Sequence, residues 1–148
     1  MSPMILVLVM LVVCMASSSI VSVISSGGYY WWSGQCGRAS DDVSKCTEVK
    51  LENGTDNVTK MTMKYKGVTI ESKDKNIYLA IEGELKPKDV QVEFMHKYVP
   101  DRIDRNGEKF RFMKNMGKTL EADDTVTYFV KFSDAVELKT TKVFYKEM

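Results

Sequence analysis

Few side chains in this sequence have the types and spacing that catalysis requires. The only imidazole belongs to His96, and alternation with Phe94 and Tyr98 predicts that it lies on one face of a strand. A lone histidine on a strand usually has a structural role. The sequence contains no Walker-type glycine loop, no His-Glu-x-x-His pair and no Gly-x-Ser-x-Gly pattern. We therefore expect no catalytic residues, no cofactor and no enzymatic activity.

One loop contains enough oxygen ligands to raise the question of a calcium site. Asp101, Asp104, Asn106 and Glu108 lie within eight positions of one another, and a hard cation is bound by several such oxygens. The spacing differs from that of an EF-hand, and arginines alternate with the acids. The pattern instead favours a solvated loop with an Asn-Gly turn, so no metal site is predicted.

The cysteines outside the apolar N-terminus are Cys36 and Cys46, ten positions apart. In an oxidising compartment a disulfide between them would close a small loop and stabilise the fold by roughly 2 to 3 kcal/mol. Two separate thiols are the alternative. A structural zinc site is not expected, because His96 is distant and alone.

Two sequons follow closely, Asn53-Gly54-Thr55 and Asn57-Val58-Thr59. Glycans on Asn53 or Asn57 would indicate a lumenal or extracellular body. The same residues also form a good turn before a strand, and this second interpretation is favoured.

The N-terminal part of the chain is uncharged as far as Arg38. Met4 to Ile24 would form a helix of about 21 residues, roughly 31 Å long, which matches a hydrocarbon core of about 30 Å. The four aromatic residues that follow are typical of a membrane-interface belt: Tyr29, Tyr30, Trp31 and Trp32. The pattern predicts a transmembrane anchor over residues 1–28 and an interface belt with a connector over residues 29–46.

A cleaved signal peptide is the alternative for this segment, since small residues surround Cys14-Met15-Ala16. The missing positive charge before the apolar run argues against it. The side of the membrane on which the body lies also stays open. Arg38 favours a cytosolic body by the positive-inside rule, whereas the cysteines favour an oxidising compartment.

Residues 47–148 alternate polar and apolar side chains with a period of two, as in Val58–Tyr65. Turn residues such as Asn106-Gly107 separate these runs, and no segment keeps a helical stripe. The predicted fold is all-β: an immunoglobulin-like or jelly-roll antiparallel β-sandwich of about seven to eight strands. The expected core is Val58, Met61, Met63, Tyr65, Val68, Ile70, Ile77, Leu79, Ile81, Val90, Val92, Phe94, Phe110, Phe112, Val126, Tyr128, Val130, Phe132, Val136, Leu138 and Val143.

Charge excludes one class of partner. The chain has 21 Lys+Arg and 20 Asp+Glu, a formal net charge of +1, and its lysines are interleaved with acids. A nucleic-acid-binding domain needs a basic face, so no nucleic acid is expected among the partners.

The order of features along the N-terminal part of the chain resembles that of a known class of membrane proteins. An apolar span, Ser17-Ser18-Ser19, then Gly27-Gly28 and the aromatic run together resemble the single-span membrane proteins of large icosahedral double-stranded DNA viruses, such as those that infect algae. The resemblance covers about the first 35 residues. Leu120–Tyr128 is loosely similar to the approach to the late tyrosine-bearing strand of immunoglobulin-like domains.

The viral resemblance implies a structural minor capsid protein that tethers an internal virion membrane to the capsid shell. Its partners would be the lipid bilayer, the major capsid protein, other minor capsid proteins and further copies of itself. Such viruses can carry thiol oxidases, which would permit a Cys36–Cys46 bridge on a cytosol-facing body. The alternative function is a secreted or cell-surface immunoglobulin-like domain that recognises a protein or glycan.

Overall fold

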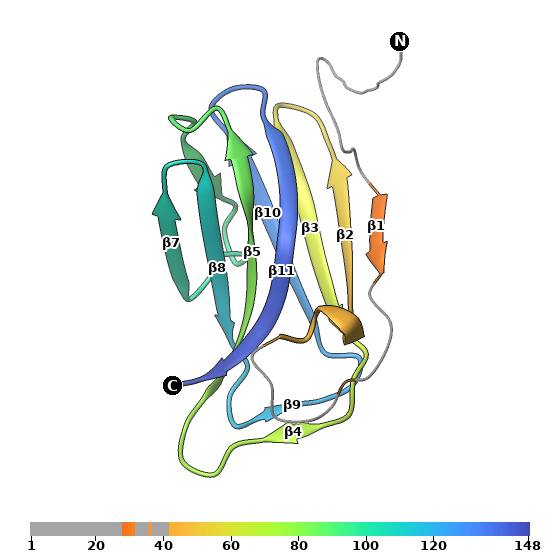
Figure 1. The fold of residues 1–148 in the computed structure, drawn as a ribbon. Coiled ribbons are helices and arrows are strands. Elements are labelled where there is room, and N and C mark those ends of the chain that lie inside the picture. Colours follow the sequence, from red (N-terminus) through yellow and green to blue (C-terminus); the bar gives the residue numbers. More distant parts are fainter. Residues whose placement is uncertain (1–27, 32–35, 37–41) are drawn as a thin grey trace.

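The computed structural model describes residues 28–31, 36 and 42–148, and these form an all-β structure (Figure 1). The elements are β1 (Gly28–Trp31), the 3₁₀ turn η1 (Ser44–Cys46), β2 (Thr47–Asn53), β3 (Val58–Tyr65), β4 (Ile70–Glu71), β5 (Ile77–Lys86), β6 (Val92–Phe94), β7 (Arg102–Asn106), β8 (Lys109–Asn115), β9 (Thr119–Leu120), β10 (Thr125–Phe132) and β11 (Glu137–Glu147). The prediction of an all-β body is confirmed, but residues 47–148 hold the ten strands β2 to β11 where about seven to eight were expected, because β4 and β9 are short strands that pair only with each other.

The strands form two main antiparallel sheets. One has the order β1-β2-β3-β10-β6 and the other the order β11-β5-β8-β7, while β4 and β9 form a small ladder across one end (Figure 1). All pairings are antiparallel. Strands distant in sequence, such as β3 and β10, are therefore neighbours in space.

Because side chains alternate between the two faces of a strand, the apolar residues at every second position bury one face of each sheet. Along β3 the side chains of Met61, Met63 and Tyr65 are fully buried, and the residues between them are half-buried. Along β10 every second residue from Val126 to Phe132 is buried in the same way. These faces pack against β5 and β8 in one continuous apolar core. Apolar burial of this kind contributes about 25 cal/mol per Å² to folding.

The predicted core needs one clear correction. Val68 is 57% exposed, because the chain leaves the sheet after Tyr65 and Val68 lies in the loop before β4. Five other members are partly buried at strand ends or on short strands: Val58, Val92, Phe94, Val136 and Leu138. The prediction also missed a second cluster, Ala80, Met113 and Phe144, on the other face of the four-stranded sheet.

At one lateral side of the sandwich a connector segment seals the gap between the sheets. The backbone N–H of Val43 and the hydroxyl of Ser44 both donate to the carbonyl of Val143 in β11, at 2.9 and 3.2 Å. The N–H of Val143 in turn donates to Ser44 Oγ at 2.9 Å. Val43 and Cys46 are 2% and 3% exposed and belong to the core. We call this the closed side.

The predicted membrane anchor lies outside the described residues except for Gly28, which begins β1. Within the described ranges no helix has the length and apolar character needed to cross a membrane. The backbone of Tyr29, Tyr30 and Trp31 runs antiparallel to β2, in register with Lys50, Val49 and Glu48, and Trp32 is outside the described part. The structure therefore places the start of the expected interface belt at a sheet edge.

Candidate functional site: a hollow at the open side of the sandwich

The lateral side opposite the closed side is bounded by β6 and β7, and here one strand is short. β3 pairs with β10 from Thr125 to Lys131, whereas β6 pairs only with Val130 to Phe132. The part of β10 from Thr125 to Phe129 thus has a strand on one side only, among the residues described. We call this the open side.

Hydrogen bonds at the two ends of β10 show which backbone groups point to the open side. The carbonyl of Asp124 and the N–H of Phe132 bond towards β3, to Tyr65 N and Asn57 O. The carbonyl of Phe129 instead accepts from Met95 N, on the β6 side, at 2.9 Å. Because backbone direction alternates along a strand, the N–H and C=O groups of Thr125 and Thr127 point to the open side as well.

A hollow of about 740 Å³ lies at this opening. Its walls come from the loop after β6, the end of β8, β9 and the first half of β10. Its lining residues are Lys97, Tyr98, Val99, Lys114, Asn115, Met116, Lys118, Thr119, Glu121, Asp124, Thr125, Val126, Thr127 and Tyr128. We call this the lateral hollow. Such concave sites with a few convergent polar groups are the usual places for ligands.

Tyr128 is a deeply buried residue among those that line the lateral hollow. Its side chain is 1% exposed, and its ring packs edge-on against Phe94 and Phe112, with centroids 5.9 Å apart in both cases. Its hydroxyl is buried and has no hydrogen-bond partner among the described residues. Buried polar groups are paired in the great majority of cases, and leaving one unpaired costs about 1 to 3 kcal/mol. This hydroxyl is therefore the feature of the site that calls for an explanation.

The protonation state of Tyr128 follows from its surroundings. Burial raises the pKa of the phenol, and the carboxylate of Asp101 raises it further. The group is therefore neutral at physiological pH and can donate one hydrogen bond. An oxygen acceptor that reached this buried hydroxyl would supply the missing partner.

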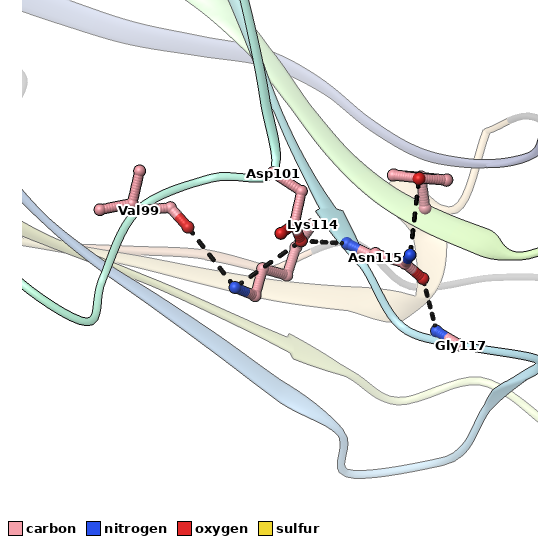
Figure 2. Close-up of polar contacts among 6 residues, drawn as sticks. Val99, Asp101, Lys114, Asn115 and Gly117 are labelled. Carbon is pink, nitrogen blue, oxygen red and sulfur yellow. Dashed lines mark hydrogen bonds and ion pairs between the residues drawn. The ribbon is translucent and has the colours of Figure 1, made fainter.

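One wall of the hollow is held in place by the polar network in Figure 2. Lys114 Nζ lies 3.4 Å from the carbonyl of Val99 and 3.7 Å from Asp101 Oδ2. The same carboxylate oxygen accepts from the N–H of Asn115 at 2.7 Å, and Asn115 Oδ1 accepts from the N–H of Gly117 at 2.8 Å. Gly117 has a φ of +81°, which glycine adopts without strain. The charge of Lys114 is thus largely balanced by Asp101.

Two other lysines of the lateral hollow, Lys97 and Lys118, are exposed and have no carboxylate within ion-pair distance in the described part of the chain. Of the two acids in the lining, Asp124 uses Oδ2 to accept from the N–H of Glu121 at 2.9 Å. Glu121 and Asp124 offset the formal charges of Lys97 and Lys118, so the lining has no net positive charge once Lys114 is paired with Asp101. Lys97, Lys118 and the neutral phenol can each donate a hydrogen bond to an oxygen acceptor such as a carboxylate.

The outer rim is apolar. Tyr98 is 39% exposed and packs edge-on against Phe129, with centroids 4.6 Å apart. Met95 and Val99 are 44% and 46% exposed on the same loop. Lys97 has a φ of +75°, and the N–H of Tyr98 donates to Met95 O, so the chain turns away from β10 here.

The predicted disulfide residues lie in different environments. Cys36 is exposed, Cys46 is buried, and the two sulfurs are not bonded to each other. Burial raises the pKa of Tyr65, and interactions with Cys46 and Cys36 raise it further, so both sulfurs lie close enough to act on this phenol. The bridge in an oxidising compartment stays a prediction.

Of the two predicted glycosylation residues, Asn53 ends β2 and Asn57 lies in the exposed turn before β3. Asn57 has a φ of +59°, and Asn53 Oδ1 accepts from Thr59 Oγ1 at 3.1 Å. The predicted turn between the two strands is therefore present. Glycan attachment stays a prediction.

The acidic segment expected to be a loop is instead a hairpin, in which Asp104 lies on β7 and Gly107 and Glu108 form the turn. Asp104 pairs with Arg102 at 3.3 Å and Asp101 with Lys114, and no group of three metal-ligating side chains occurs in the described residues. His96 is exposed and lies in a turn, because β6 ends at Phe94 and not at Tyr98. The expectation that His96 sits on a strand is therefore wrong.

Sequence reasoning missed the lateral hollow. Tyr128 alternates as a core residue should, and no residue type marks the position where β6 ends. The nearest signal was His96-Lys97, two polar residues that interrupt the alternation after Phe94.

Comparison with known proteins gives no relative. No protein-family model, no curated protein and no solved structure matches this chain.

Proposed function

We propose that this chain is a non-enzymatic recognition domain that binds an acidic group of a partner in the lateral hollow. The buried, unpartnered hydroxyl of Tyr128 supports the proposal most strongly. Lys97 and Lys118, which have no ion-pair partner among the described residues, can each donate a hydrogen bond to an anion, and the neutral phenol offers it another. The site has no nucleophile with an adjacent base, so binding is the function it fits.

The rest of the chain fits the same proposal. Neighbouring strands that are distant in sequence indicate a Greek-key sandwich, the connectivity that immunoglobulin-like and jelly-roll domains share. The apolar N-terminal segment is the proposed means of display, as a membrane anchor with the sandwich outside the bilayer. Copies confined to one surface gain effective concentration, which strengthens weak contacts.

The test uses the full chain in detergent micelles and two labelled octapeptides, one acidic and one basic, with fluorescence anisotropy as the readout. We expect the acidic peptide to bind and the basic peptide not to bind. Tyr128→Phe should weaken binding of the acidic peptide at least tenfold. Tyr65→Phe, which alters another buried phenol outside the hollow, should not change the affinity for the acidic peptide.

If both variants bind the acidic peptide equally well, the peptide does not bind in the lateral hollow, and this part of the proposal is wrong. Failure of acidic peptide, acetate and inorganic phosphate to shift any resonance of a lining residue would end it.

A second candidate, a membrane-to-capsid tether in a virion, draws support from the uncharged N-terminal segment and its resemblance to viral membrane proteins. Intact mass measured on protein from its native source separates the two. A full-length mass of 16.8 kDa that glycosidase does not change, with virion capsid proteins crosslinked to the sandwich, would favour the tether. A shortened chain carrying glycan would favour a secreted recognition domain.

A further inference from the structure

We infer that the occupant of the lateral hollow is an extended acidic peptide segment, which adds a strand to β10 along Thr125–Thr127 and places a carboxylate at the Tyr128 hydroxyl. The inference rests on the proposed function and names the chemical class of its ligand. It follows from the backbone of the open side, the side chains that border it and the state of the other sheet edges.

The backbone of the open side provides the template. Beyond the Met95–Phe129 hydrogen bond the loop turns away, so the groups of Thr125 and Thr127 face the hollow with no strand beside them among the described residues. The stretch from Thr125 to Phe129 is about 14 Å long at 3.4 Å per residue. An extended peptide of four or five residues would continue the line of β6 and pair with this edge, which is the recognised mode of strand addition.

The side chains of such a peptide would alternate between two environments. Those on the inner face would point towards Val126 and Tyr128, and those on the outer face towards Phe129 and the exposed ring of Tyr98. A carboxylate on the inner face can accept from the Tyr128 hydroxyl and lie near Lys97 or Lys118. An apolar residue on the outer face can pack on Tyr98 and Met95. The expected ligand therefore alternates acidic and apolar residues.

Two other sheet edges, β11 and β7, carry features that hinder strand addition. At β11 the N–H and C=O of Val143 are already bonded to Ser44 and Val43. At β7 the edge carries alternating charges, and Arg105 donates to the carbonyls of Val90 and Lys88, both at 3.0 Å. Charged side chains on an edge discourage pairing with another chain. Unlike these two edges, the open side of β10 borders the lateral hollow.

The experiment compares three capped peptides on the full chain in detergent micelles. The first has the sequence TVEVEVT, the second is the same peptide with N-methyl groups on alternate residues, and the third is TVKVKVT. N-methylation removes the backbone donors of one edge and leaves the acidic side chains in place. We expect TVEVEVT to bind at least tenfold more tightly than either control.

Hydrogen exchange reports on the backbone directly. The amides of Thr125 and Thr127 should exchange at least tenfold more slowly with TVEVEVT bound. The amide of Val126, which points to β3, should not change. Thr127→Pro removes one open-side donor and should weaken binding, and its melting temperature shows whether the variant is folded. The N-methyl comparison does not depend on any variant.

The outcomes separate this inference from the proposed function. If both peptides that carry glutamate bind equally and Tyr128→Phe weakens both, the hollow binds acidic groups without strand addition, and the inference fails alone. If inorganic phosphate or a sulfated polysaccharide binds there while no peptide does, the inference also fails alone. If no probe binds in the hollow, both fail.

Discussion

The closed and open sides of this sandwich differ in how the backbone of the edge strand is covered. On the closed side, the connector before β2 supplies Val43 and Ser44 to the edge of β11, and both backbone groups of Val143 are bonded. On the open side, β6 ends after three residues, and the lateral hollow lies beside the uncovered part of β10.

Each side has a buried tyrosine, and the pair shows what this difference means. Tyr65 packs beside η1, and its hydroxyl donates to the carbonyl of Val68 at 2.6 Å. Tyr128 is buried just as deeply, and its hydroxyl has no partner in the described part of the molecule. One phenol contributes to stability, and the other lowers it. A site that lowers stability in the unbound protein is a common sign of a binding function.

The largest expected effect lies on the closed side. Ser44→Ala leaves the buried N–H of Val143 without its acceptor and removes one donor from the Val143 carbonyl. We expect the free energy of unfolding to fall by about 2 to 3 kcal/mol, measured by urea denaturation. Ser72→Ala, which removes a single longer bond to Lys75 N at 3.3 Å, is the matched control and should cost under about 1 kcal/mol. Equal losses would show that η1 does not seal this side.

The second effect is a loss of stability at alkaline pH. Burial raises the pKa of both Tyr65 and Tyr128 above the unfolded value of about 10. The unfolded chain therefore releases these protons first as pH rises. Stability should be unaffected by the two phenols below about pH 10 and then fall by about 1.4 kcal/mol per pH unit for each phenol.

Melting temperatures between pH 9 and 11 measure this loss. Each phenol should contribute its own part of the fall in stability with rising pH. Tyr128→Phe should remove the contribution of Tyr128, and Tyr65→Phe should remove that of Tyr65. A slope unchanged by either variant would contradict the burial of these groups.

The third effect compares the two phenols at neutral pH. Tyr65→Phe removes a bonded hydroxyl and should lower the free energy of unfolding by about 1 kcal/mol. Tyr128→Phe removes an unpartnered hydroxyl, so stability should stay the same or rise by up to about 1 kcal/mol. Urea denaturation of both variants checks the sign. A loss at Tyr128 as large as that at Tyr65 would mean that the Tyr128 hydroxyl is already satisfied.

The smallest effect is expected at the strand end next to the open side. Ser133 Oγ accepts from the N–H of Gln91 at 2.9 Å, and this bond is exposed. Ser133→Ala should change the free energy of unfolding by less than about 0.5 kcal/mol, because water can replace the acceptor. The same denaturation series measures it beside Ser44→Ala. A loss near that of Ser44→Ala would remove the distinction between the two sides.

The sequence predicted the parts of the fold that depend on local alternation. Met61 and Met63 in β3, and Val126 and Val130 in β10, are buried as their spacing indicates. It did not predict that Val68 leaves the sheet or that β6 ends at Phe94, because both depend on where distant strands stop pairing. The lateral hollow depends on the same long-range pairing, so Tyr128 looked like an ordinary core residue.

The position of β1 has a mechanical consequence. β1 is the edge strand beside β2 in the five-stranded sheet (Figure 1). The lateral hollow is lined by β10, three strands away in the same sheet. A pull between the N-terminal segment and a partner held at β10 would cross three ladders in series. The β1–β2 ladder pairs four residues, and the β2–β3 and β3–β10 ladders pair seven each. Under load, β1 should therefore detach first, which would lengthen the tether while the sandwich and its bound partner stay intact.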